Sequence, residues 1–175
     1  MGYQLKALSA AAIPAALERA ERYRLLNEPA QAESICLDVL AVDPNDQKAI
    51  VLLLLSISDQ LADNLTENLD RASALLPRLT DKYQRTYYQG VLYERMARVY
   101  LRRPTPGSHF SAFDVLREAM RRYEEAERLH PPGNDEALLR WNTCARTIKG
   151  SRLEARPIDD FLIGSREDNP PQESR

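Results

Sequence analysis

The side chains best suited to chemistry are few in this sequence, and they lie far apart. Two cysteines, Cys36 and Cys144, and two histidines, His109 and His130, show no C-x-x-C pattern and no cysteine–histidine spacing typical of a zinc site. Cys144 falls among apolar residues at helical spacing, where a thiol is usually an inert core residue. We therefore predict neither a metal site nor a cysteine nucleophile.

Other catalytic arrangements are equally poorly supported. The adjacent carboxylates Asp159 and Asp160 lie in a segment with no element to fix their geometry, and no glycine-rich phosphate loop occurs. His109 follows Pro106-Gly107-Ser108 in a predicted loop, where it could contact a ligand or be solvated. The sequence predicts a protein that is not an enzyme and that needs no cofactor.

Arginines form the densest group of charged side chains. Four of them follow one predicted helix, at Arg95, Arg98, Arg102 and Arg103, and three more follow on the next helix, at Arg117, Arg121 and Arg122. Such a stripe could bind phosphate or nucleic acid. Glutamates interleave with it at three- and four-residue spacing, as in Glu94 with Arg98, Glu118 with Arg121 or Arg122, and Arg121 with Glu125. These pairs favour ordinary helix surfaces, and we expect no nucleic-acid partner.

Composition sets the broad class of the protein. The 175 residues, 29% charged and 43% hydrophobic with a net charge of −2, are typical of one globular domain without a field that would attract polyanions. The apolar run at residues 50–57 is much shorter than the roughly 18–20 residues needed to span a bilayer. Two cysteines fit a reducing compartment, and the N-terminal alanines merge with an amphipathic helix from Pro14. We predict a cytoplasmic protein that does not bind a membrane.

One spacing recurs three times along the chain. A small or apolar residue, a bulky one, a small or β-branched one and a proline follow each other at intervals of four, three and five: Ala32, Cys36, Val39, Pro44; Leu65, Leu69, Ala72, Pro77; and Ala119, Tyr123, Ala126, Pro131. This pattern favours a helix that packs closely on a partner helix and ends near proline. Matching first helices contain Ala20 with Tyr23 and Gly90 with Tyr93.

These residues resemble the tetratricopeptide repeat (TPR) family, a 34-residue helix-turn-helix unit; "AERYRLLNEPAQAESICLDVLAVDPND" is the stretch most similar to it. The resemblance implies an all-α fold, a right-handed α-solenoid of antiparallel helix hairpins with about three repeats and a C-terminal helix. We assign residues 1–12 to an N-terminal extension and 13–149 to the repeats, with an insertion loop at about 103–111. Residues 150–175 have the composition of a mostly disordered tail with an apolar knot at 158–163.

The resemblance also implies a function, because the first helices of TPR hairpins line a concave groove. The expected partner-binding residues on that groove are Leu17, Glu21, Arg24, Lys48, Val51, Leu55, Tyr87, Val91, Glu94, Arg98, Thr143 and Arg146. We expect a scaffold or adaptor that holds a peptide or amphipathic helix of another protein. Two alternatives stay open: these residues pack on each other or on the tail, or the chain self-associates through a flank containing Leu138, Trp141, Ala145 and Ile148.

Overall fold

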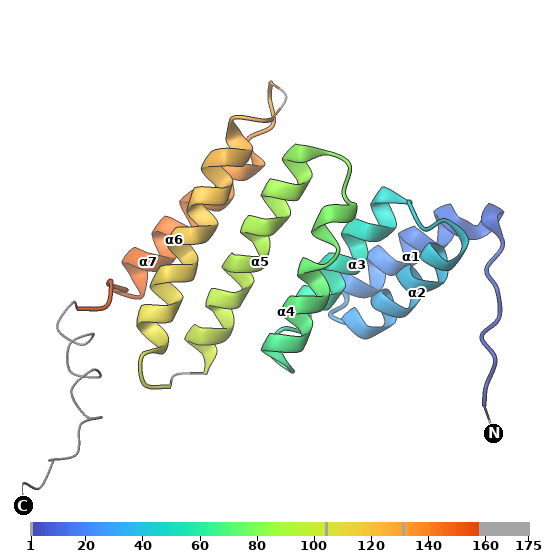
Figure 1. The fold of residues 1–175 in the computed structure, drawn as a ribbon, viewed down its shortest axis with the longest axis horizontal. Coiled ribbons are helices and arrows are strands. Elements are labelled where there is room, and N and C mark those ends of the chain that lie inside the picture. Colours follow the sequence, from blue (N-terminus) through green and yellow to red (C-terminus); the bar gives the residue numbers. More distant parts are fainter. Residues whose placement is uncertain (1, 104, 131, 158–175) are drawn as a thin grey trace, which may run out of the picture.

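The computed structural model describes residues 2–103, 105–130 and 132–157, and within these the fold is all-helical (Figure 1). The elements in chain order are the 3₁₀ turn η1 (Ala10–Ala12), the helices α1 (Ile13–Leu25), α2 (Pro29–Val42), α3 (Gln47–Asp59) and α4 (Leu65–Ser73), the 3₁₀ turn η2 (Leu76–Arg78), and the helices α5 (Lys82–Arg102), α6 (Ser108–Glu127) and α7 (Glu136–Gly150). No helix of this part combines the length and apolar content needed to cross a membrane.

Helix starts follow local chemistry that the sequence shows directly. Asp46 caps α3 by accepting a hydrogen bond from the Ala49 amide at 2.7 Å. Asn64 caps α4 in the same way through its side-chain oxygen. These caps satisfy amides that the first helical turn leaves without partners.

Two helices end with a non-glycine residue in the left-handed conformation. Asn27 follows α1 with φ 60°, and Arg152 follows α7 with φ 51°. The next amide in each case donates to a carbonyl of the last turn: Glu28 to Tyr23 at 2.9 Å and Leu153 to Ile148 at 3.0 Å. This hydrogen bond defines the Schellman motif. It turns the chain sharply at both ends.

Helices succeed each other along the long axis of the molecule, and each packs against its neighbours in sequence (Figure 1). The contact between α5 and α6 is the most extensive, and Gly90 makes it close: a Cβ there would lie 2.7 Å from the ring of Tyr123. By contrast, α4 contacts α5 much less than α2 contacts α3. The cause is length, because α4 has 9 residues and α5 has 21.

The core consists of two clusters that meet at this sparse contact. One is built from α1 to α4 with Leu75 and Leu79 on either side of η2 and Leu92 of α5. The other is built from α5 to α7 with Leu153. The run at residues 50–57 supplies much of the first cluster, with Val51 and Leu55 half-buried as its least covered apolar members. Leu55 and Tyr88 pack against both clusters and join them.

Two expectations about loops are corrected. The predicted loop 103–111 is shorter, because Gly107 with φ 80° ends it and α6 begins at Ser108. His109 therefore lies exposed in the first turn of a helix. The second expectation assigned residues 150–157 to a mostly disordered tail. Leu153 is instead buried in the second core cluster, and the guanidinium of Arg156 lies 5.6 Å from the centroid of the Phe110 ring. The apolar knot 158–163 lies outside the described residues.

Candidate functional site

The predicted groove residues lie on α1, α3, α5 and α7, whose shared surface we call the first-helix face, but many are unavailable to a partner. Leu17, Tyr87, Val91 and Glu94 are buried. Val51, Leu55 and Arg24 are half-buried. The exposed members are Glu21, Lys48, Arg98, Thr143 and Arg146, and the first two pair with each other at 3.6 Å.

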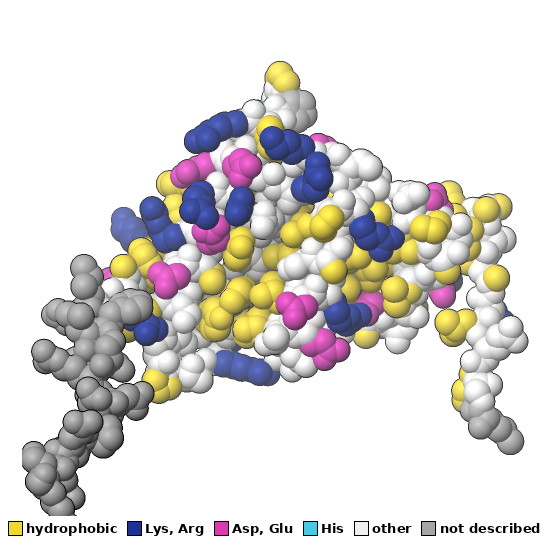
Figure 2. All heavy atoms as spheres, in the orientation of Figure 1, with side chains coloured by type: hydrophobic (Ala, Val, Ile, Leu, Met, Phe, Trp, Pro, Cys, Tyr) yellow, Lys and Arg dark blue, Asp and Glu magenta, His cyan; other side chains and the backbone are white. Residues whose placement is uncertain are grey.

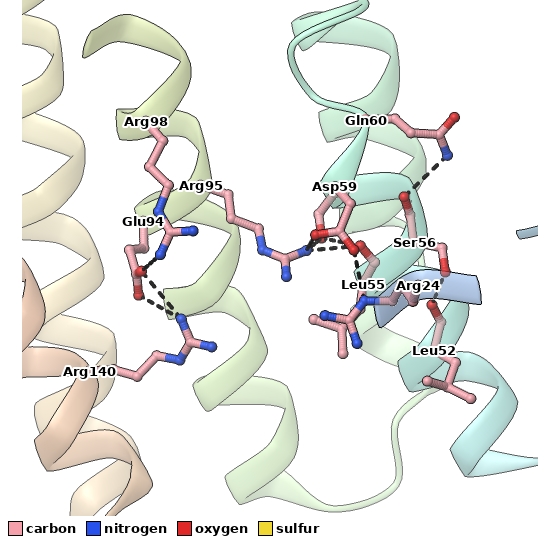
Figure 3. Close-up of polar contacts among 11 residues, drawn as sticks. Arg24, Leu52, Leu55, Ser56, Asp59, Gln60, Glu94, Arg95, Arg98 and Arg140 are labelled. Carbon is pink, nitrogen blue, oxygen red and sulfur yellow. Dashed lines mark hydrogen bonds and ion pairs between the residues drawn. The ribbon is translucent and has the colours of Figure 1, made fainter. Parts of the chain in front are cut away.

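Ion pairs join α1, α3 and α5 across this face. Asp59 of α3 accepts from Arg24 of α1 at 2.7 Å and pairs with Arg95 of α5 at 3.0 Å (Figure 3). Arg95 also donates to the carbonyl of Leu55 at 2.8 Å and to the hydroxyl of Ser58. Burial lowers the pKa of Arg95 to about 10, and Asp59 opposes that shift. The side chain of Arg95 thus bridges the junction between the two core clusters.

A second polar cluster joins α5, α6 and α7 around Glu94. This carboxylate is only 3% exposed, and it accepts from the hydroxyl of Tyr123 at 2.9 Å and from Arg140 at 3.1 and 3.2 Å. Arg98 also pairs with it, as the sequence predicted (Figure 3). Burial, followed by the charge of Glu94, raises the pKa of Tyr123.

Tyr87 belongs to the same cluster and not to an open surface. Arg140 donates to its hydroxyl at 3.1 Å, and its ring lies 5.8 Å from that of Tyr123 and 5.7 Å from that of Tyr83. We expected this side chain to reach a partner, but α6 and α7 cover it. The predicted pairs of Glu118 with Arg121 and Arg122 are present on α6. Glu125, predicted to pair with Arg121, pairs with Arg122 at 3.1 Å instead.

Two hollows flank α5 on different sides. The first, which we call the arginine pocket, opens on the first-helix face with a volume of about 190 Å³. It is lined by Asn27, Ser58, Asp59, Leu61, Ala62, Arg95, Arg98, Val99 and Arg102. The three arginines recur at spacings of three and four along α5, so they share one side of that helix.

The second hollow, which we call the apolar groove, lies where α4 fails to cover α5. It has a volume of about 500 Å³ and is lined by Leu69, Ser73, Leu76, Pro77, Arg85, Thr86, Gln89, Leu92 and Tyr93. Figure 2 shows hydrophobic side chains gathered on the surface between α4 and α5. This groove was not predicted from the sequence, although Arg85, Gln89 and Tyr93 are spaced four residues apart and mark that side of α5.

A third apolar area lies on α7, on the flank predicted for self-association. Leu138 is 40% exposed, and a hollow of about 370 Å³ lies among Glu124, Glu127, Leu138, Trp141 and Asn142. Trp141 is half-buried and donates to Glu124 at 2.9 Å. Ala145 and Ile148 pack against the second core cluster, so only part of the predicted flank is free.

The two thiols are placed for packing. Cys36 and Cys144 are fully buried, and burial raises the pKa of each to about 12, so both stay protonated at neutral pH. Within the described ranges, no three histidine, cysteine, aspartate or glutamate side chains gather in a way that could hold a metal ion. Compared with protein-family models, curated proteins and solved structures, the chain finds no match.

Proposed function

We propose that this protein is a non-catalytic interaction module, a solenoid of TPR-like hairpins that binds an amphipathic helix of a partner protein in the apolar groove. The groove itself is the observation that carries the proposal. Its volume of about 500 Å³ lies in the range of roughly 300–1,000 Å³ typical of binding pockets. Its lining combines apolar side chains with a few polar ones, as binding sites generally do.

The position of the groove supports a helical occupant. In a stack of hairpins, the second helix of one hairpin packs along the first helix of the next, as α2 does on α3. Here α4 is less than half as long as α5 and leaves part of its flank uncovered. A helix from another chain can supply the missing contact, using apolar residues at positions i, i+3 or i+4, and i+7.

The rim of the groove indicates the charge of the partner. Arg85 is exposed and makes no ion pair with any described residue, whereas Ser73, Thr86 and Gln89 are neutral. A helix whose apolar face is bordered by aspartate or glutamate therefore fits the rim. We place the docking site here and not on the first-helix face, because ion pairs and buried tyrosines occupy much of that face.

A displayed library of amphipathic helical peptides tests this proposal without knowledge of the natural partner. Gln89→Trp fills the groove, while Gln84→Trp places the same residue on α5 outside the groove lining. We expect selected peptides to bind the wild type and Gln84→Trp alike and to lose about tenfold or more in affinity for Gln89→Trp. Equal binding to both variants, or no apolar helical pattern among the peptides, would refute the groove as the site.

Self-association through the flank of α7 is a second candidate, favoured by the hollow beside Trp141 and by the exposure of Leu138 at 40%. Leu37 of α2 is 51% exposed and lies elsewhere, so it provides a matched control. If this flank is a dimer interface, light scattering will report a dimer for the wild type and for Leu37→Glu and a monomer for Leu138→Glu. A wild-type monomer at every concentration would eliminate this candidate.

A further inference from the structure

The arginine pocket carries a local excess of positive charge in a chain whose net charge is −2. The connected groups around it comprise five guanidinium groups, of Arg24, Arg95, Arg98, Arg102 and Arg140. Among the described residues, the carboxylates that pair with these groups are those of Asp59 and Glu94. Five positive and two negative charges leave an excess of three.

Helix termini reduce this excess without removing it. The C-terminal ends of α1, α3 and α5 lie at the pocket, since Asn27, Asp59 and Arg102 line it. Each helix end contributes about half a negative charge, so three of them offset about 1.5 charges. Roughly 1.5 positive charges therefore remain, which the helix ends do not explain.

Arg95 uses its hydrogen-bond donors within the protein, whereas Arg98, Arg102 and Asn27 keep donors without a described partner. Arg95 is fixed by Asp59, the Leu55 carbonyl and Ser58, so it forms a rigid wall. Arg98 reaches Glu94 through one terminal nitrogen and remains 53% exposed. Within the described ranges, Arg102 makes no ion pair and the Asn27 amide group makes no hydrogen bond. These residues line one hollow, Asn27 from the end of α1 and the arginines from α5.

We propose that the arginine pocket binds a phosphate group, either inorganic phosphate or the end of a small phosphomonoester. Guanidinium groups pair with phosphate through parallel N–H···O bonds, and a dianion matches the residual charge better than a carboxylate does. The volume of about 190 Å³ equals about six water molecules, enough for the phosphate and part of a carrier. The pocket and the apolar groove flank α5 on different sides, so this inference is independent of the proposed function.

Calorimetric titration at constant ionic strength tests the inference with inorganic phosphate, O-phosphoserine and acetate. Arg102→Gln removes a lining charge, and Arg103→Gln removes the same charge one residue outside the lining. We expect phosphate to bind about tenfold more weakly to Arg102→Gln and unchanged to Arg103→Gln. Tighter binding of O-phosphoserine than of phosphate would identify a phosphomonoester, and equal binding would identify the free ion.

Asn27→Gly provides a further variant that keeps the backbone intact. Glycine adopts φ 60° without strain, so this change removes the amide side chain and preserves the end of α1. We expect phosphate affinity to fall about threefold or more, with an unchanged unfolding midpoint as the check on folding. Three results would overturn the proposal: no heat of binding with millimolar phosphate, equal loss in Arg102→Gln and Arg103→Gln, or equal affinity for acetate.

Discussion

Replacing Glu94 by glutamine should loosen the contact of α5 with both α6 and α7. The carboxylate is 3% exposed and accepts hydrogen bonds from Tyr123, Arg140 and Arg98. Glutamine has nearly the same shape but carries one acceptor oxygen and an NH₂ group. An amide oxygen in the place of Oε2 can still accept from Tyr123 and Arg140. The NH₂ group then replaces Oε1 and faces the guanidinium donors of Arg98 and Arg140 with no acceptor between them.

The expected size of the loss follows from these contacts. Each hydrogen bond to a buried charge is worth about 1.5–3 kcal/mol, and removing one member of a buried ion pair costs about 3–5 kcal/mol. Because Arg98 is 53% exposed and can turn to water, we take the lower end and predict about 3 kcal/mol for Glu94→Gln. Tyr123→Phe should cost about 2 kcal/mol, because it removes one bond to the carboxylate.

Urea unfolding followed by circular dichroism measures both changes and their coupling. The double variant should lose at least about 1 kcal/mol less than the sum of the single losses, because the two side chains share one bond. Glu118→Gln is the control on an exposed pair, whose arginine is 68% exposed, and should change stability by less than about 0.5 kcal/mol. A loss below about 0.5 kcal/mol for Glu94→Gln, at unchanged m-value, would refute the reasoning.

Two further predictions concern titration and packing. Burial raises the pKa of Cys36 and Cys144 from 9.0 to about 12, so their contribution to stability is complete below pH 9 and is lost as the pH rises toward 12. Between pH 9 and 10 the free energy of unfolding should fall by about 1 kcal/mol per cysteine, and urea titrations with reductant should show a smaller fall for Cys36→Ala. Gly90→Ala should destabilise the protein by about 1 kcal/mol, since overpacking against Tyr123 exceeds the gain in helix propensity. Gly150→Ala meets no atom within 4 Å, so thermal unfolding should show equal or higher stability, and a loss equal to that of Gly90→Ala would contradict the packing argument.

Sequence reasoning located the helices because their signals are local. The small residue at Gly90, the bulky Tyr123 and the cap at Asp46 each act within a turn or across one hairpin. Val51 and Leu55, which the TPR resemblance assigned to the groove, are the half-buried members of the run at residues 50–57.

The composition of the site was harder to predict because it depends on distant partners. Glu94 stands four residues before Arg98, which indicated an ordinary surface pair, but Tyr123 and Arg140 bury it from 29 and 46 positions away. Tyr87 is covered for the same reason. The apolar groove arises because α4 ends at Ser73, four residues before the proline that predicted its end.

The division of the core into two clusters bears on how the protein folds. Most contacts join helices adjacent in sequence, which favours rapid folding of each hairpin from local interactions. Few contacts couple α4 to α5, so the segment from α1 to α4 and the segment from α5 to α7 can open as separate cooperative units. Native-state hydrogen exchange should then resolve two opening free energies, and the bridge from Arg95 to Asp59 sets how tightly they are linked.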